Sequence, residues 1–502
     1  SPEFLTLRGV ANAQDWKNEA ALIDFLSIDL DMIEEARYWK SFVLADLGDW
    51  EQAVKTLPKH YRPLQNYPAN IANSLALVLA EVNLRDGRVA EAEELLAIIE
   101  HNKAELPDPI MAYLKYLSGE AARQKGDKER AQEIWEELTQ DKDDLFRTKS
   151  GLALAVLLDQ NNKITNKDMI DRLERLRYAW RGDELEAQVN YWLGQAYFKD
   201  KNFIKGLSIM REAAAIAGDT LLASRITKDM GQVFVDLYLG HDLKNVSPID
   251  AVALYEQFSE LTPVGPKGDK MVQMLAEHLV NADLLSKATK LLEYQVDHRL
   301  SGEDKMRVAI RLAAINLLDK QPQKAINALS KAEAVLVLLS NKDEVRKRAH
   351  EIALLRVRAY LQNKQYDTAL SLLEKMPESK DVHRLRADIA WQAGYWDEAA
   401  ASLNDVLIDE NLVPDSALTE EQASLILNRS IALSLDNDRI ALANMREKYL
   451  SPIAKSGFKA NQFEVITRPR GSSALADRET LMSAVSEVDL FKDFLESYRK
   501  EQ

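Results

Sequence analysis

The sequence contains no cysteine among its 502 residues, and glycine and proline are scarce, with 18 and 14 copies. Without cysteine, the chain forms neither disulfides nor thiolate metal sites. Scarce glycine and proline disfavour sandwiches, barrels and disorder, and they favour long helices joined by short turns. These absences predict an all-α fold.

No run of about 18 apolar residues is present, so no membrane-spanning helix is expected. Basic residues are outnumbered, 65 against 80 acidic ones, and the net charge is −15. This charge repels phosphate backbones and anionic lipid surfaces, so nucleic acid is not an expected partner. The length exceeds that of one compact core, which predicts several domains or one extended array.

A short motif recurs at a fixed interval near the start of the chain. Its copies span residues 48–53, 87–92 and 126–131, and in each a glycine precedes an alanine by five residues. Each copy lies between two stretches with helical apolar periodicity, which predicts a helix, a tight turn and a second helix. The glycine accepts the left-handed conformation that ends the first helix, and the small alanine lets the two helices approach closely.

Looser copies of the motif continue toward the C-terminus. Further turns are expected before Gly206, Ala288, Ala325, Ala369 and Ala399. The intervals of 37, 44 and 30 residues between the last four show that the helix lengths vary. Helices near 220–239 and 248–261 are expected to fill the wider gap after Gly206.

These motifs resemble the tetratricopeptide repeat family. Residues 191–213 carry the family's order of Leu-Gly, Tyr, small, bulky and Ala, with Gly206 where alanine is usual. Residues 394–399 are close to the family's turn. The resemblance covers roughly 35–410 and implies an all-α, right-handed superhelical solenoid of antiparallel helix pairs that share one continuous core. An irregular helical bundle is the alternative.

The chain divides into segments at points of composition change. Residues 1–4 look like a vector-derived remnant, so the native protein is expected to begin upstream and the sequence names no compartment. N-terminal repeats are expected over 5–262 and a second set over 263–415. The Pro/Gly-rich segment Pro263–Lys270 between them is the predicted hinge.

The last segment, 416–502, is expected to begin with a helix pair and then to become irregular. Helical periodicity is lost over 458–476, where Phe463–Ile466 looks like a strand. An amphipathic helix over 478–498 is expected to cap the array, because the end of a solenoid otherwise exposes its core. Docking of this helix on a partner is the alternative.

The sequence carries no convergent set of catalytic residues. Seven histidines lie far apart, and none is paired at the spacing of metal ligands. His350 and Glu351 begin like a zinc-protease helix, but Leu354 stands where the second ligand belongs. Adjacent acidic residues point about 100° apart on a helix, which indicates solvated faces. No catalytic, metal-binding or cofactor-binding residue is predicted, no cofactor is expected, and the chain is expected not to be an enzyme.

The resemblance implies that the first helices of the pairs line a concave surface that binds a peptide, a helix or a partner domain. Most tryptophans are expected to pack between helices, and one or two to line this surface. The candidate contacts are polar first-helix residues: Arg37, Lys40, Asn73, Lys115, Asn190, Gln195, Arg356 and Arg384.

The predicted function is therefore that of a non-catalytic protein-interaction scaffold of unknown oligomeric state. Two alternatives stay open, a peptide-sensing regulatory repeat protein and a helical-toroid glycoside hydrolase. Residues 255–299 and 488–499 also resemble uncharacterised repeat proteins of α-proteobacteria, some of them associated with flagellar motility or the cell envelope. That resemblance implies a bacterial envelope scaffold, with the periplasm favoured over the cytoplasm.

Overall fold

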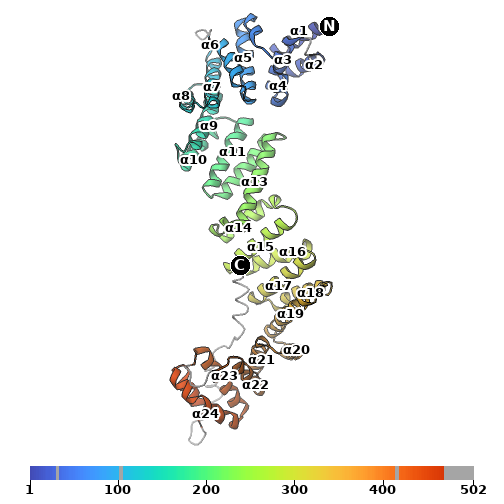
Figure 1. The fold of residues 1–502 in the computed structure, drawn as a ribbon, viewed down its shortest axis with the longest axis vertical. Coiled ribbons are helices and arrows are strands. Elements are labelled where there is room, and N and C mark those ends of the chain that lie inside the picture. Colours follow the sequence, from blue (N-terminus) through green and yellow to red (C-terminus); the bar gives the residue numbers. More distant parts are fainter. Residues whose placement is uncertain (30–32, 101–105, 413–417, 469–502) are drawn as a thin grey trace. The chain divides into compact units, whose positions relative to one another are not determined.

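The computed structural model describes residues 1–29, 33–100, 106–412 and 418–468. Within these ranges the chain forms α-helices joined by short turns, with three short 3-10 helices and no strand. None of the described helices is long and apolar enough to cross a membrane. Consecutive helices pack as antiparallel pairs along the chain (Figure 1). The prediction of an all-α helical repeat is confirmed.

The first of two compact units spans Ser1–Val233. Its helix pairs are α1 (Pro2–Gln14) and α2 (Asn18–Leu26), α3 (Glu34–Asp46) and α4 (Trp50–Thr56), α5 (Ala69–Arg85) and α6 (Val89–Glu100), α7 (Asp108–Lys125) and α8 (Lys128–Leu138), α9 (Asp144–Gln160) and α10 (Asn166–Leu176), and α11 (Glu184–Lys199) and α12 (Phe203–Ala217). A 3-10 helix, Arg62–Asn66, joins the second pair to the third.

The second compact unit begins at Phe234, within α13 (Leu221–Leu239). Its other helices are α14 (Pro248–Gln257), α15 (Pro266–Asn281), α16 (Leu285–His298), α17 (Gly302–Leu318), α18 (Pro322–Leu336), α19 (Lys342–Gln362), α20 (Tyr366–Leu373), α21 (Lys380–Ala393), α22 (Trp396–Asp409), α23 (Glu420–Asp436), α24 (Arg439–Ser456) and α25 (Ala460–Thr467). The short 3-10 helices Asp242–Asn245 and Ser259–Leu261 flank α14.

The tight turns of the first unit have the backbone that the repeated glycine predicts. Gly48, Gly87 and Gly126 adopt φ of 82°, 75° and 91°. The next N–H then reaches back to the end of the first helix, as when Asp49 N–H donates to the Leu44 carbonyl at 2.9 Å. This bond satisfies a carbonyl that the helix leaves free and fixes the direction in which the second helix starts.

The alanine five residues after each turn lies in the contact between the two helices of its pair. All seven predicted positions are 0% exposed: Ala53, Ala92, Ala131, Ala288, Ala325, Ala369 and Ala399. In the looser copies Asp283, Lys320 and Lys364 hold the left-handed position in place of glycine, with φ of 61°, 55° and 59°. The first pair follows the same rule with Trp16 (φ 59°) and the fully buried Ala21. Sequence reasoning missed this copy because tryptophan replaces the glycine.

Gly206 replaces the usual alanine because an aromatic ring fills the space. A Cβ at position 206 would lie 2.4 Å from Cε1 of Phe198 and 3.2 Å from the carbonyl oxygen of Gly194. Phe198 is itself buried and stacks on Phe203. The α11–α12 crossing therefore exchanges a methyl group on one helix for a phenyl ring on the other.

The predicted irregular segment in the C-terminal part begins as a helix. Phe463–Ile466, expected to be strand-like, lies inside α25, where both end residues are buried against the core that α23 and α24 share. Two apolar residues three positions apart fit one face of a helix, so that spacing outweighs the strand propensity of the segment. The expected capping helix, 478–498, lies outside the described residues.

The segment Pro263–Lys270 lies within the second unit and leads into α15. Gly265 has φ of 89°, and Pro266 occupies the first turn of the helix. A Cβ at Gly268 would lie 2.0 Å from the Pro263 carbonyl oxygen, so the loop packs directly on the first helical turn. The contacts divide the chain at Val233 and Phe234. The hinge and the repeat boundary at 263 stay predictions.

Candidate functional site

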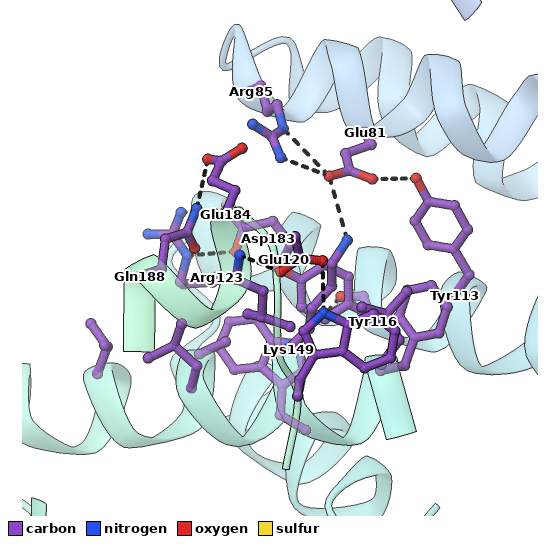
Figure 2. A pocket seen from close by; sticks show the side chains of 18 of the residues that line it. Glu81, Arg85, Tyr113, Tyr116, Glu120, Arg123, Lys149, Asp183, Glu184 and Gln188 are labelled. Carbon is purple, nitrogen blue, oxygen red and sulfur yellow. Dashed lines mark hydrogen bonds and ion pairs between the residues drawn. The ribbon is translucent and has the colours of Figure 1, made fainter. Parts of the chain in front are cut away.

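A groove of about 750 Å³ runs along the first helices of the first unit. Its walls come from α3, α5, α7, α9 and α11 and from the loop that leads into α11. The second helices contribute only Trp50 of α4 and Trp135 of α8. Successive first helices thus present one surface, as the resemblance implies, and Figure 2 shows the side chains that line it.

Helical spacing brings the lining residues onto one face of each helix. Glu81 and Arg85 are one turn apart on α5, and Tyr113, Tyr116 and Glu120 follow at three- and four-residue steps on α7. Side chains at these steps lie above one another on one face of a helix. The groove therefore continues from helix to helix.

A buried carboxylate lies at the centre of the groove. Glu81 is 7% exposed, and its side chain faces Arg85, Tyr113 and Lys149 (Figure 2). Arg85 Nη2 lies 3.1 Å from Glu81 Oε1, and Lys149 Nζ lies 3.9 Å from the same oxygen. The Tyr113 hydroxyl donates a hydrogen bond to the other carboxylate oxygen.

Aromatic rings hold both of these cations in place. Lys149 Nζ lies between 5.5 and 5.8 Å from the ring centroids of Tyr113, Tyr116 and Phe146. Arg85 lies over Trp50 at 3.6 Å. The electron-rich faces of aromatic rings attract cations. The groove therefore combines rings and a carboxylate around two positive charges of the chain itself.

The pKa of Glu81 follows from this surrounding. Burial alone would raise the pKa of its carboxyl, but Lys149, Arg85 and the Tyr113 hydrogen bond stabilise the anion more, so the pKa is lowered from its ordinary value. Burial and the neighbouring Glu81 raise the pKa of Tyr113 well above its ordinary value. At neutral pH the pair is thus a carboxylate and a neutral phenol. A general acid needs a raised pKa, so Glu81 is a poor proton donor.

The other end of the groove is formed by the start of α11. Trp180 Nε1 donates to Asp183 at 2.6 Å, and Asp183 also accepts the Leu185 N–H at 2.9 Å as the N-cap of the helix. Gln188 donates to Glu184 at 2.8 Å. Carboxylates and an indole therefore face the groove where α11 begins.

The similarity of this chain to known proteins is structural. No protein-family model and no curated protein sequence match it. Similar solved structures include the APC/C hetero-tetramer Cut9–Hcn1, 14% identical with a TM-score of 0.27 over 97% of this chain and 96% of that chain. The P58(IPK) TPR domain is 14% identical with a TM-score of 0.24, over 78% of this chain and 98% of that one. Naa15/Naa10 bound to HypK is 14% identical with a TM-score of 0.26, over 99% and 77%.

The helix pairs of this chain, with their left-handed turns and buried alanines, decide the fold. It is a tetratricopeptide-like helical repeat. In such a repeat each pair buries its apolar face only by stacking on its neighbours, so the chain presents a long surface along its first helices.

The eight residues expected to contact a partner lie outside this tetratricopeptide-like groove. Asn73 and Asn190 are only 7% and 1% exposed, so these two side chains pack inside the helical layers and are not available on the surface. Arg37 and Lys40 are half-buried on α3, and burial, with Arg37 nearby, lowers the pKa of Lys40. Gln195 is half-buried on α11.

The other three candidates hold neighbouring helices together. Lys115 lies 2.5 Å from Glu137, Arg356 lies 2.9 Å from Glu333, and Arg384 bridges to Glu410 and Glu421 at 3.0 and 3.2 Å. Each ion pair joins a first helix to a neighbouring helix or, for Glu410, to the residue that ends one. A partner role for the surface residues of this set stays a prediction.

Sequence reasoning missed the residues at the centre of the groove, because Glu81 and Lys149 come from helices two repeats apart. One pattern in the sequence could have indicated this groove: Tyr113, Tyr116 and Glu120 follow one another at three- and four-residue steps along α7.

Four tryptophans line the groove: Trp50, Trp135, Trp180 and Trp192. The expectation that one or two tryptophans line a concave surface stays a prediction. Trp135 is 0% exposed and packs beneath Gly119, where a Cβ would lie 2.4 Å from its Nε1.

A second, smaller hollow of about 260 Å³ lies in the second unit. Its lining comes mainly from α15, α17 and α19 and includes Glu277, Arg307, Arg311 and Arg348. Burial raises the pKa of Glu277, with Arg311 nearby opposing that effect. The described residues contain no group of three His, Asp or Glu side chains placed to hold a metal ion.

Proposed function

We propose that this chain is a non-catalytic protein-interaction scaffold, and that an extended segment of a partner protein binds in the groove along α3, α5, α7, α9 and α11. The observation that carries the proposal is the groove itself, which continues across five successive first helices. An extended segment of a partner spans such a surface and contacts each helix in turn.

The side chains of the groove suit protein recognition. Trp50, Tyr113, Tyr116, Trp180 and Trp192 are half-buried along it, so each offers part of its ring to a ligand. Tryptophan and tyrosine are enriched among the few residues that supply most of the binding energy in protein interfaces. Its central carboxylates, Glu81 and Glu120, are both engaged by cations of the chain, which supports a binding role over an acid–base role.

The proposal extends to the cellular setting. The resemblance of residues 255–299 to repeat proteins of α-proteobacteria supports a bacterial scaffold that assembles or positions an envelope machine such as the flagellar motor. Fractionation of the source cells tests this part separately. Recovery of the protein with the periplasmic or envelope fraction is expected, and purely cytoplasmic recovery would contradict it.

Site-specific crosslinking tests the binding role. Random peptides displayed on phage are selected on the full chain, and a selected peptide is then bound to variants that carry a photo-crosslinking phenylalanine analogue. Gln188 places the probe in the groove, and the exposed Glu136 on α8 places it outside. Crosslinks from position 188 and none from 136 are expected. Equal crosslinking from both, or selection of no peptide at all, would refute a groove ligand.

Replacement of one aromatic side chain gives the size of the effect. Trp180→Ala should lower the affinity for the selected peptide about 10- to 30-fold, as for a tryptophan at the centre of an interface. Trp16→Ala is the matched control, because Trp16 is 77% exposed and lies outside the groove. Equal losses in both variants would point to a general effect on folding.

A further inference from the structure

The cations of the groove are all used by the chain itself. Arg85 and Lys149 face Glu81, and Arg123 lies 2.5 Å from Glu120. No further lysine or arginine lines the groove among the described residues. A ligand therefore meets no unpaired positive charge there.

Three carboxylates of the same groove have no cation. Asp46, Asp183 and Glu184 line it, and within the described parts of the chain none of them forms an ion pair. Their hydrogen-bond donors are neutral groups: the Asn18 amide, the Trp180 indole, the Leu185 N–H and the Gln188 amide. After its internal pairs are formed, the groove thus retains only negative charge.

The α11 side of the groove also has aromatic rings that hold no cation, and one of them, Trp180, contacts Asp183. Trp180 and Trp192 line the same end of the groove, and no arginine or lysine of the described residues lies over either ring. At the centre of the groove, the chain fills the same combination of rings and carboxylate with its own Lys149 and Arg85. The α11 end has the same rings and carboxylates but no cation of the chain.

We propose that the α11 end of the groove, formed by Trp180, Asp183, Glu184 and Trp192, binds a lysine or arginine side chain of the partner segment. This inference rests on the proposed function. The expected partner is a basic segment with apolar residues beside the cation. Rings attract the cation, and the two carboxylates accept its charge-assisted hydrogen bonds. The net charge of −15 also attracts a basic partner at long range.

A charge-neutral double variant tests the proposal. Asp183→Asn with Glu184→Gln removes both charges, and asparagine still caps α11 because its side-chain oxygen accepts the same N–H. The matched control is Glu91→Gln with Glu94→Gln, which changes the net charge equally on two exposed residues of α6. Thermal melting of both variants verifies that the fold is intact.

The probe is a peptide selected by phage display on the full chain, together with a copy in which its lysine or arginine is replaced by methionine. Selected peptides should be enriched in basic residues. The double variant and the methionine peptide should each weaken binding about five- to tenfold, and the control variant should not. The double variant combined with the methionine peptide should lose no more affinity than either change alone, because both changes remove the same interaction.

The possible results separate this inference from the proposed function. Two results would overturn the basic-partner inference and leave the groove as a binding site. One is peptides that crosslink to position 188 but carry no basic residue. The other is additive losses of affinity when the double variant is combined with the methionine peptide. If the α6 control weakens peptide binding equally, the effect is long-range attraction by the net charge, and the basic-partner inference is also overturned. Failure to select any groove-binding peptide would overturn both.

Discussion

Glu81 illustrates how a single side chain stabilises the groove. A carboxylate that is 7% exposed would be costly without partners, and here Arg85, Lys149 and Tyr113 compensate for the lost hydration. The same contacts orient Tyr113 and place the Lys149 ammonium beside the rings of Tyr113, Tyr116 and Phe146. One acidic residue on α5 thereby sets the positions of side chains on α7 and α9.

Glu81→Gln should lower the free energy of unfolding by about 1–3 kcal/mol at pH 7, because it leaves Lys149 and Arg85 without their anion. The folded-state pKa of Glu81 lies below its ordinary value of 4.5, so its contribution is present above that pH. The contribution is lost as pH falls through the lowered pKa.

Chemical denaturation of both proteins from pH 7 to pH 3 measures this difference. The stability gap should narrow as the pH falls below 4.5. Glu136→Gln, an exposed position on α8, serves as the control and should melt like the unmodified chain. A gap that persists unchanged at pH 3 would mean that the charge of Glu81 does not stabilise the fold.

Within each helix pair, the crossing depends on one small residue. Alanine holds this place in seven predicted copies, all of them fully buried, and Gly206 holds it where Phe198 needs the space. Close packing leaves no room to enlarge the small residue without moving its neighbour. The identity of one residue therefore sets the distance between two helices.

Gly206→Ala should destabilise the chain by about 1–3 kcal/mol, because its methyl group would overlap the Phe198 ring. Gly231→Ala is the matched control on α13, where nothing lies within 4 Å of the added Cβ. That change should instead stabilise by about 0.5–1 kcal/mol, because alanine favours helix.

Thermal melts of both variants decide between these outcomes. Phe198→Leu should reduce the cost of Gly206→Ala, since it frees the space beside position 206, and a double-mutant cycle measures that coupling. A harmless Gly206→Ala variant would show that α11 and α12 do not cross as closely as described.

Over the whole molecule, stacked pairs need covered ends. The last described helices expose Phe458 (42%), Val465 (60%) and Ile440 (78%), which is apolar surface that the described residues do not cover. Repeat arrays stay soluble only when their terminal pairs are capped. The apolar pattern of residues 481–495 predicts a segment suited to that role.

Deletion of residues 477–502 should therefore lower the melting temperature or cause aggregation. Differential scanning calorimetry and light scattering of the full and shortened chains measure both effects. Glu136→Gln, at an exposed position on α8, is the control and should change neither. A shortened chain that melts normally but no longer binds the selected peptide would assign this segment to partner binding instead.

The amino-acid sequence by itself determined the helical class, the positions of most turns and the small residue of each crossing. These features are local: a left-handed turn and the alanine five residues after it lie within one short stretch of chain. The same local reasoning failed at Trp16, where tryptophan occupies a turn position that usually takes glycine, and at Phe463–Ile466, where burial against α23 and α24 favours a helix.

Only the tertiary structure decided which residues form the groove. Glu81 and Lys149 meet because α5, α7 and α9 stack side by side, and no spacing along the chain reveals that meeting. For the same reason Asn73 and Asn190, polar residues on first helices, lie buried between layers, whereas Asp183 and Glu184 face the groove. The direction of a side chain on a repeat helix depends on the neighbouring repeats, because each pair buries its apolar face only by stacking on them.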